Sequence, residues 1–282
     1  MTPPALVDIG INLAHDSYDH DRDAVIARAL AACVCRMVVT GSSLDSTLRA
    51  IELCRQHPGL MRATAGVHPH HAEAFAPADD ARLAALLADP MVTSAGECGL
   101  DYFRNFSCPK AQRDAFARQL GIAVAAGKPL FLHQRDAHAD FMAILRDYLP
   151  EIPRAVVHCF TGTGDELQDY LAAGLYVGIT GWICDERRGL EVKALTREIP
   201  LDRLMIETDG PYLLPRNLPR KVSHRRNEPM YLRYILEAIC EVRTEPVAEI
   251  ADAATRNALM FFDLPPLPPP AVAAEPAPLV LM

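Results

Sequence analysis

The chain contains eight short apolar segments, and each is followed by a polar, glycine or catalytic-type residue. The segments end near Ile11, Thr40, Val67, Glu97, His133, His158, Thr180 and Asp209. They lack the polar–apolar alternation of a half-exposed strand, which is typical of parallel strands covered on both faces. Successive ends lie roughly 20 to 40 residues apart, which leaves room for a helix and two loops. The pattern therefore predicts eight consecutive βα units.

Amphipathic stretches fill the intervals between these segments. They cover residues 21–33, 46–56, 79–87, 110–126, 137–148, 164–173, 189–198 and 230–242. Eight strands alternating with eight helices predict an α/β protein with the (β/α)8 fold, the TIM barrel. A doubly wound open sheet is the alternative, but no Gly-x-Gly-x-x-Gly phosphate turn follows the first strand. We expect a further helix over residues 247–262 to close the bottom or the side of the barrel.

The end of the chain differs in composition from the rest. After Asp263 the sequence continues with a proline run and an Ala/Pro tail. Proline lacks a backbone donor and fixes φ, so such a segment forms neither regular helix nor sheet. We therefore expect one catalytic domain over residues 1–263 and a mobile appendage without catalytic role over residues 264–282.

Composition narrows the class of protein only slightly. Of the 282 residues, 50% are hydrophobic and 23% charged, and the net charge of −8 argues against a broad basic face that coats duplex nucleic acid. The eight cysteines show no CxxC spacing, the N-terminus shows no signal pattern, and no apolar stretch reaches the ~20 residues that span a bilayer. We expect a cytoplasmic protein with no membrane contact. Without a repeated interface pattern, a monomer is the default expectation.

Four chemistry-bearing residues occupy equivalent positions in this pattern. Glu97, His133, His158 and Asp209 each stand at the predicted carboxyl end of a strand, and these ends converge on one mouth of a barrel. Taken singly, each has a structural explanation as a helix cap, a core histidine or the start of a turn. Helix caps and core histidines have no reason to share a ring, however. Two imidazoles and two carboxylates meeting at one point suit a divalent cation.

Other polar residues are expected near the same mouth. Side chains two apart on a strand share a face, so Arg135 points with His133. Arg135 is suited to bind a phosphate or to form an ion pair with Glu97 or Asp209. A salt bridge with its neighbours Asp136 or Asp140 is an equally open alternative.

The histidines after the third strand are a second case. His68 is the first residue past that strand, so we expect it to contact a phosphate or leaving group. His70 and His71 are interpreted as solvated loop residues.

The predicted rim loops add charge and aromatic rings. For the arginines of these loops two interpretations are open, namely that they guide an anionic substrate or that they are solvated. These arginines are Arg216, Arg220, Arg225 and Arg226. The aromatic residues of the loops stack on bases or simply pack; they are Tyr102, Phe103, Phe106, Trp182 and Tyr212. Because strand residues alternate in direction, Cys98 and Cys159 are expected to point away from the mouth.

Together these segments resemble the TatD family of metal-dependent deoxyribonucleases, within the amidohydrolase-type barrels. The matching stretches begin at Asp8, Thr64, Gly96, His133, His158, Gly178, Ile206 and Arg226. The resemblance implies a 3′–5′ exonuclease acting on single-stranded DNA and RNA with a divalent metal, usually Mg²⁺. It also implies that Glu97, His133 and His158 bind the metal, that Asp209 is a ligand or base, and that His68 contacts substrate.

One departure concerns the first strand. Many relatives carry Asp-x-His-x-His there, whereas this chain has Gly10 and Asn12 at the histidine positions. Glycine offers no ligand and an asparagine carbonyl is a weak donor. The resemblance therefore implies one secure metal and a second that is absent, weakly held or completed by substrate phosphate.

The leading hypothesis is phosphodiester hydrolysis by a metal-activated water, with Asp209 as base and with His68 and Arg135 offsetting phosphate charge. Two imidazoles also suit Mn²⁺ or Zn²⁺, so the native metal stays open. Hydrolysis of an amide, lactone or other ester is a second hypothesis. A non-catalytic barrel that binds nucleic acid or a partner is a third.

Overall fold

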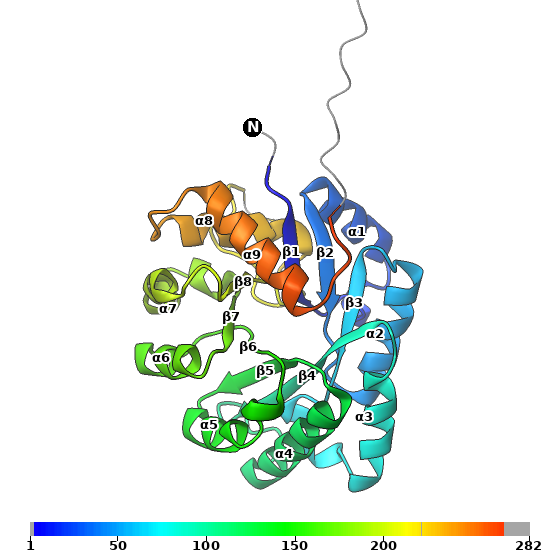
Figure 1. The fold of residues 1–282 in the computed structure, drawn as a ribbon. Helices are drawn as coiled ribbons and strands as arrows, with labels where there is room; N and C mark the ends of the chain where they lie inside the picture. Colours follow the sequence, from blue (N-terminus) through cyan, green and yellow to red (C-terminus); the bar gives the residue numbers. More distant parts are fainter. Residues whose placement is uncertain (1–2, 221, 268–282) are drawn as a thin grey trace, which may run out of the picture.

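The computed structural model describes residues 3–220 and 222–267, and within these ranges eight parallel strands form one sheet (Figure 1). The strands are β1 (Leu6–Ile11), β2 (Val34–Val39), β3 (Met61–Ala65), β4 (Val92–Asp101), β5 (Leu130–Arg135), β6 (Ala155–Val157), β7 (Tyr176–Ile179) and β8 (Leu204–Ile206). Each strand pairs with the next along the chain. This order confirms the predicted (β/α)8 barrel and excludes the doubly wound alternative.

Helices surround the strands. They are α1 (Arg22–Ala31), α2 (Leu44–Gln56), α3 (Asp80–Leu87), α4 (Pro109–Ala126), α5 (His138–Arg146), α6 (Gly164–Ala172), α7 (Leu190–Leu195), α8 (Leu232–Cys240) and α9 (Val247–Phe261). Short 3₁₀ helices occur at Asp16–Tyr18, Pro69–Ala74, Pro77–Asp79, Leu149–Glu151, Gly181–Cys184, Thr196–Glu198 and Pro229–Tyr231. None of the described helices is both long and apolar enough to cross a membrane.

The seam between β1 and the segment after β8 is closed by backbone and side-chain hydrogen bonds together. Two backbone bonds of 2.8 Å cross it, from the N–H of Asn12 to the carbonyl of Gly210 and from the N–H of Asp209 to the carbonyl of Gly10. The buried Asp8 carboxylate accepts hydrogen bonds from the backbone N–H of Thr208 at 2.9 Å and from its hydroxyl at 2.5 Å. The Asp8 side chain thus supplements the backbone bonds where the barrel closes.

Helix α9 packs against one end of the barrel, as predicted. Phe261 and Phe262 are fully buried and join the strand residues Val7, Phe131 and Met205 in the interior cluster. Burying each such ring contributes roughly 1.5–3 kcal/mol. Because this end is filled, a ligand has access from the opposite end, where the strands finish.

Two strands carry an extra residue at the level of the mouth. Between Ala95 and Cys98, three residue steps of β4 face two of β5, and β1 shows the same irregularity between Asp8 and Ile11 against β2. Such bulges bend a strand and re-aim a side chain. The expected end of the fourth strand at Glu97 is therefore wrong: β4 continues to Asp101.

The predicted tail begins inside the described part of the chain. Leu264 is buried in the interior cluster, and Arg36 donates to the carbonyl of Pro265 at 2.9 Å. The remainder of the expected appendage, residues 268–282, lies outside the described residues.

Candidate active site

A pocket of about 690 Å³ opens at the carboxyl ends of the strands. All six residues predicted for the site line it, namely His68, Glu97, Arg135, His133, His158 and Asp209. The strands and their following loops carry these residues to one place because parallel strands in a barrel end on the same side. The predicted convergence is therefore seen in the structure.

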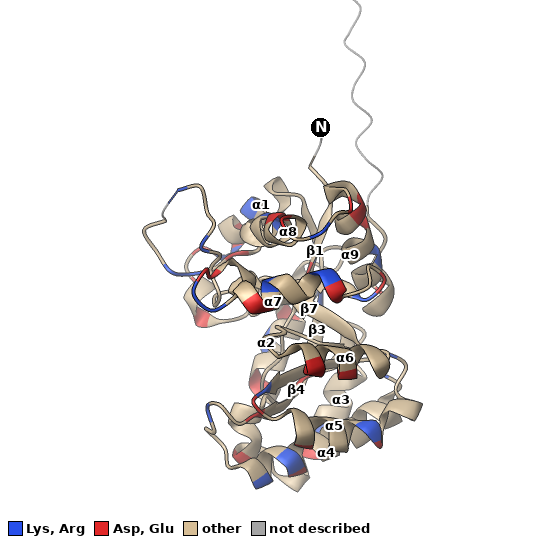
Figure 2. Ribbon diagram, turned by 90° about the vertical axis from the view of Figure 1, so that its left-hand side faces the viewer, with Lys and Arg blue, Asp and Glu red and all other residues tan. Residues whose placement is uncertain are grey.

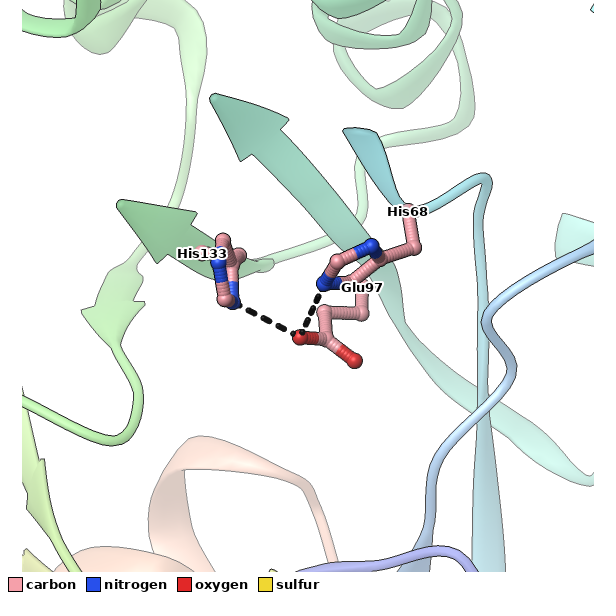
Figure 3. Close-up of side chains that lie close together, drawn as sticks. All are labelled: His68, Glu97 and His133. Atoms are coloured by element: carbon pink, nitrogen blue, oxygen red, sulfur yellow. Dashed lines mark ion pairs between the residues drawn. The ribbon is translucent and has the colours of Figure 1, made fainter. Parts of the chain in front are cut away.

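The centre of the pocket is one carboxylate oxygen contacted by three imidazoles. Glu97 Oε1 lies 2.7 Å from Nε2 of His158, 3.0 Å from Nδ1 of His133 and 3.3 Å from Nε2 of His68. Figure 3 shows Glu97 between His68 and His133. The ligand atoms of His68, Glu97 and His133 all lie within 4.8 Å of one another, which is the arrangement of a group able to hold a metal ion.

Two further carboxylates stand behind the histidines. Glu207 Oε2 lies 3.3 Å from Nδ1 of His158, and Asp101 Oδ2 lies 3.6 Å from Nε2 of His133. Carboxylates that orient a histidine from its far nitrogen are typical of metal sites. Although His133 Nδ1 lies 3.0 Å from Glu97, neither nitrogen of this buried ring makes a hydrogen bond of good geometry among the described residues, which leaves the ring available to a cation.

The electrostatics of the pocket are strongly coupled. Burial alone would raise the pKa of Glu97, but the imidazoles of His68, His158 and His133 outweigh it and hold that pKa well below its usual range. For His158, burial is outweighed by Glu97 and Glu207, which raise its pKa well above the ordinary value. The pocket therefore stabilises positive charge beside Glu97.

His68 differs from the other two histidines. Burial lowers its pKa to about 4, so the ring is neutral at neutral pH. Its Nδ1 accepts the backbone N–H of His70 at 3.1 Å. A neutral ring whose Nδ1 accepts must carry its proton on Nε2, the atom that faces Glu97. In this arrangement His68 donates a hydrogen bond toward Glu97, and His158, whose raised pKa favours the protonated ring, donates to Glu97 from Nε2 and to Glu207 from Nδ1.

Asp209 is held by the first strand. Its Oδ1 accepts from Nδ2 of Asn12 at 3.1 Å, and the same amide nitrogen donates to the carbonyl of Gly210 at 3.2 Å. Desolvation, with the nearby carboxylates of Glu97 and Glu207, raises the pKa of Asp209 to about 8 against the opposing charge of His158. Asn12 thus orients Asp209 with its amide.

Arg135 lines the pocket as its strand position predicted, but it forms none of the ion pairs proposed from sequence. Its guanidinium lies 3.8 Å from the ring centroid of Phe103 and 5.9 Å from that of Trp182. Among the described residues it forms no ion pair with Glu97, Asp209, Asp136 or Asp140. Aromatic rings, and no carboxylate, position this arginine.

Two local expectations were wrong. His70 is not a solvated loop residue: its Nε2 lies 2.7 Å from Asp101 Oδ2, and its ring packs on His68. Cys159 lines the pocket because its φ of 48° breaks the strand alternation after His158. Burial raises the pKa of the Cys159 thiol well above 9.0, so the thiol is neutral.

In the basic loop after β8, Arg226 differs from both sequence-based interpretations, which were substrate guidance and a solvated side chain. Arg226 donates to Asp21 at 2.7 and 2.8 Å and to the buried Glu228 at 2.9 Å. Arg216 lies 3.3 Å from Asp185, whereas Arg220 and Arg225 are exposed. Arg226 is therefore an internal tie that fixes the loop.

Sequence reasoning missed Asp101 and gave Glu207 no role. Asp101 was expected beyond the strand end, yet the longer β4 carries it to His70 and His133. The sequence holds a signal for Glu207, because it stands two residues before Asp209 and side chains two apart on a strand share a face. Only the fold could show that its partners are His158 and the backbone N–H of Cys159, the latter at 2.5 Å.

An eight-stranded parallel barrel with a histidine–carboxylate cluster in its mouth defines a hydrolase of the metal-binding barrel class. Residues 7–263 match the model of the TatD related DNase family, and the chain belongs to that family.

Curated relatives match nearly the whole chain. A "3′-5′ ssDNA/RNA exonuclease TatD" from Cronobacter turicensis is 51% identical over 257 residues, which cover 91% of this chain and 97% of that protein. The protein of the same name from Edwardsiella piscicida is 47% identical and covers 92% and 100%.

Solved structures agree with this. A TatD homologue from Escherichia coli superposes with a TM-score of 0.84 at 25% identity, covering 92% of this chain and 98% of its own. A TatD family hydrolase from Entamoeba histolytica gives 0.85 at 25% identity, covering 94% and 100%.

Proposed function

We propose that this protein is a divalent-metal-dependent 3′–5′ exonuclease that hydrolyses phosphodiester bonds of single-stranded DNA and RNA. The observation that carries the proposal is the single oxygen of Glu97 contacted by His68, His133 and His158 at the barrel mouth. The relatives named as exonucleases support it, since they align over almost their full length.

Glu97, His133 and His158 are the residues proposed to hold the metal. Glu207 orients His158 from Nδ1, as carboxylates do behind ligating histidines, and the His158 ring would release its Nε2 proton when a cation binds. When bound, a divalent cation polarises the phosphate and makes water more acidic. Mg²⁺ suits a phosphate substrate and is our first assignment; Mn²⁺ and Zn²⁺ suit the imidazoles.

The remaining residues handle charge and the proton. Asp209, held by Asn12, is proposed to accept a proton from the attacking water, because a bound cation would lower its pKa from about 8 and ionise it; alternatively, it acts as a further ligand. His68 donates from Nε2 to a phosphate oxygen or leaving group. Arg135 offsets negative charge on the phosphate from the other side of the pocket.

The cellular location and the oligomeric state are also part of the proposal. All eight cysteines are free thiols, which suits the reducing cytoplasm. We propose a monomer with nucleic acid as its partner, and no obligate protein partner.

Metal content and product pattern test the function together. We expect purified protein to bind one divalent ion per chain and to shorten a 5′-labelled single strand stepwise from its 3′ end. Asp209→Asn should lower kcat at least 100-fold while metal is still bound, and Asp202→Asn, an exposed aspartate before β8, should not. Hydrolysis of amides or lactones without oligonucleotide cleavage would contradict the proposal, as would binding without turnover; unchanged nuclease turnover in Asp209→Asn would remove the base assignment.

A further inference from the structure

Arginines and aromatic rings alternate along one side of the pocket. The order is Arg104, Phe103, Arg135, Trp182, Arg188, and the distances from each guanidinium carbon to the adjacent ring centroid are 5.5, 3.8, 5.9 and 4.6 Å. We call these five residues the arginine–aromatic row. They come from the loop after β4, from the end of β5 and from the segment after β7. Three separate parts of the chain thus build one continuous feature.

The row contains positive charge that no carboxylate neutralises. The side chains of Arg104 and Arg135 form no hydrogen bond or ion pair with any other residue in the described ranges. Arg188, at the far end, is paired with Asp185 at 3.1 Å. An arginine stacked on rings keeps its N–H groups available in a fixed plane, which suits phosphate oxygens. This is unexpected in a chain with a net charge of −8, and it concentrates cations beside the proposed metal site.

The rings of the row are already engaged. Phe103 lies against two guanidinium groups, and so does Trp182. Two other rim rings differ, since Phe106 and Tyr212 are exposed and have no arginine over them. Tyr102 is fixed by its hydroxyl, which donates to Asp140 at 2.7 Å. The five aromatic residues expected at the rim therefore form three groups. Phe103 and Trp182 pack against arginines, Phe106 and Tyr212 have no arginine over them, and Tyr102 is held by Asp140.

Figure 2 shows loops with Lys and Arg projecting to the left of the barrel, on the side away from α9. A strand whose 3′ end is in the pocket must leave through this mouth, because α9 closes the opposite end. Everything that leaves lies on the 5′ side of the bond to be cleaved. The arginines of the row line the pocket that such a strand leaves, whereas the exposed Arg220 and Arg225 do not line it.

We propose that the arginine–aromatic row binds the phosphate backbone of the substrate strand on the 5′ side of the cleaved bond, with Arg104 and Arg135 contacting phosphates and Phe103 and Trp182 holding them in place. Phe106 and Tyr212 receive the adjoining bases. This inference rests on the proposed function, because it takes a single nucleic-acid strand as the ligand.

Equilibrium binding separates the row from catalysis. The probe is a fluorescent single-stranded 12-mer in chelator, which prevents turnover, with an unlabelled dinucleotide as competitor. Each lost phosphate contact should reduce the slope of log Kd against log salt by about 0.7. We expect this reduction for Arg104→Gln, with a three- to tenfold weaker 12-mer affinity at low salt. Phe103→Leu removes the clamp and keeps the charge, so it should raise Kd about threefold with the slope retained.

The matched control is Arg203→Gln. Arg203 also stacks on a ring, 4.9 Å from Tyr176, but immediately before β8 at the other end of the barrel. It should leave affinity and slope at wild-type values. The proposed role of the arginine–aromatic row is contradicted if Arg104→Gln has the same affinity and salt slope as Arg203→Gln. It is also contradicted if the dinucleotide competes as well as an unlabelled 12-mer. Row-dependent binding without cleavage in Mg²⁺ or Mn²⁺ would instead contradict the exonuclease and leave the row standing.

Discussion

The Glu207 carboxylate occupies the space next to Gly10: a Cβ at residue 10 would lie 2.2 Å from Glu207 Oε2 and 3.1 Å from Phe131. A histidine at residue 10, as in the Asp-x-His-x-His motif, would overlap with this carboxylate. Gly10 therefore does more than leave one metal ligand out, because it makes room for the Glu207 carboxylate that contacts Nδ1 of His158. Asn12, at the second histidine position, is committed to Asp209.

Gly10→Ala should force Glu207 away from His158. Overpacking of this kind costs roughly 1–3 kcal/mol of unfolding free energy. We expect that loss in urea denaturation, together with a higher Mg²⁺ concentration for half-maximal activity. Gly59→Ala is the control, since no atom lies within 4 Å of a Cβ there. Equal behaviour of the two variants would show that Glu207 moves without consequence.

Glu207→Gln tests the same carboxylate without a change of volume. Loss of a carboxylate behind a ligating histidine typically weakens metal binding 10- to 100-fold. We expect that range by calorimetric titration, with the far-ultraviolet spectrum of the wild-type chain. Metal affinity equal to wild type would mean that Glu207 serves only the backbone N–H of Cys159.

The pH dependence of the unfolding free energy should reveal the titration of Asp8. Burial raises its pKa to about 7 despite hydrogen bonds from Thr208 and Gly10, against 3.8 for an ordinary aspartate. The folded chain therefore keeps a proton that the unfolded chain loses above about pH 4, and the contribution of Asp8 declines as pH rises toward 7. Relative to Asp8→Asn, wild-type unfolding free energy should fall between pH 4 and 7, by at most about 1.4 kcal/mol per unit. Parallel stability curves for the two proteins would refute this.

Arg225 and Arg226 are neighbours with different expected roles. Arg226→Gln breaks hydrogen bonds to Asp21 and Glu228 and should lower the unfolding free energy by roughly 1–3 kcal/mol. Arg225→Gln removes an exposed charge and should change stability by less than about 0.5 kcal/mol. Thermal or chemical denaturation decides this, and a stable Arg226→Gln protein would contradict the internal tie.

Sequence periodicity predicted the barrel because near-continuous apolar strands and amphipathic helices are local signals. It also predicted that Glu97, His133, His158 and Asp209 meet, because parallel strands finish on one side. It could not place Asp101, which depends on the extra residue in β4 and on pairing with β5.

Other features depend on backbone angles or on distant partners. Cys159 enters the pocket through a positive φ, which no alternation rule foresees. Asp21, one partner of Arg226, lies 205 positions away in the sequence. Strand parity places Glu207 on the same face as Asp209, but it does not predict the contact between Glu207 and Gly10. That contact exists only because β1 and β8 lie side by side.

The most direct test of the central claim is a metal titration of chelator-treated protein against a 5′-labelled single strand. The account predicts no cleavage in chelator and, as Mg²⁺ is restored, a ladder that shortens from the 3′ end in the wild-type protein but not in His158→Ala. Equal cleavage in chelator, or products from internal cuts alone, would contradict a metal-dependent 3′–5′ exonuclease.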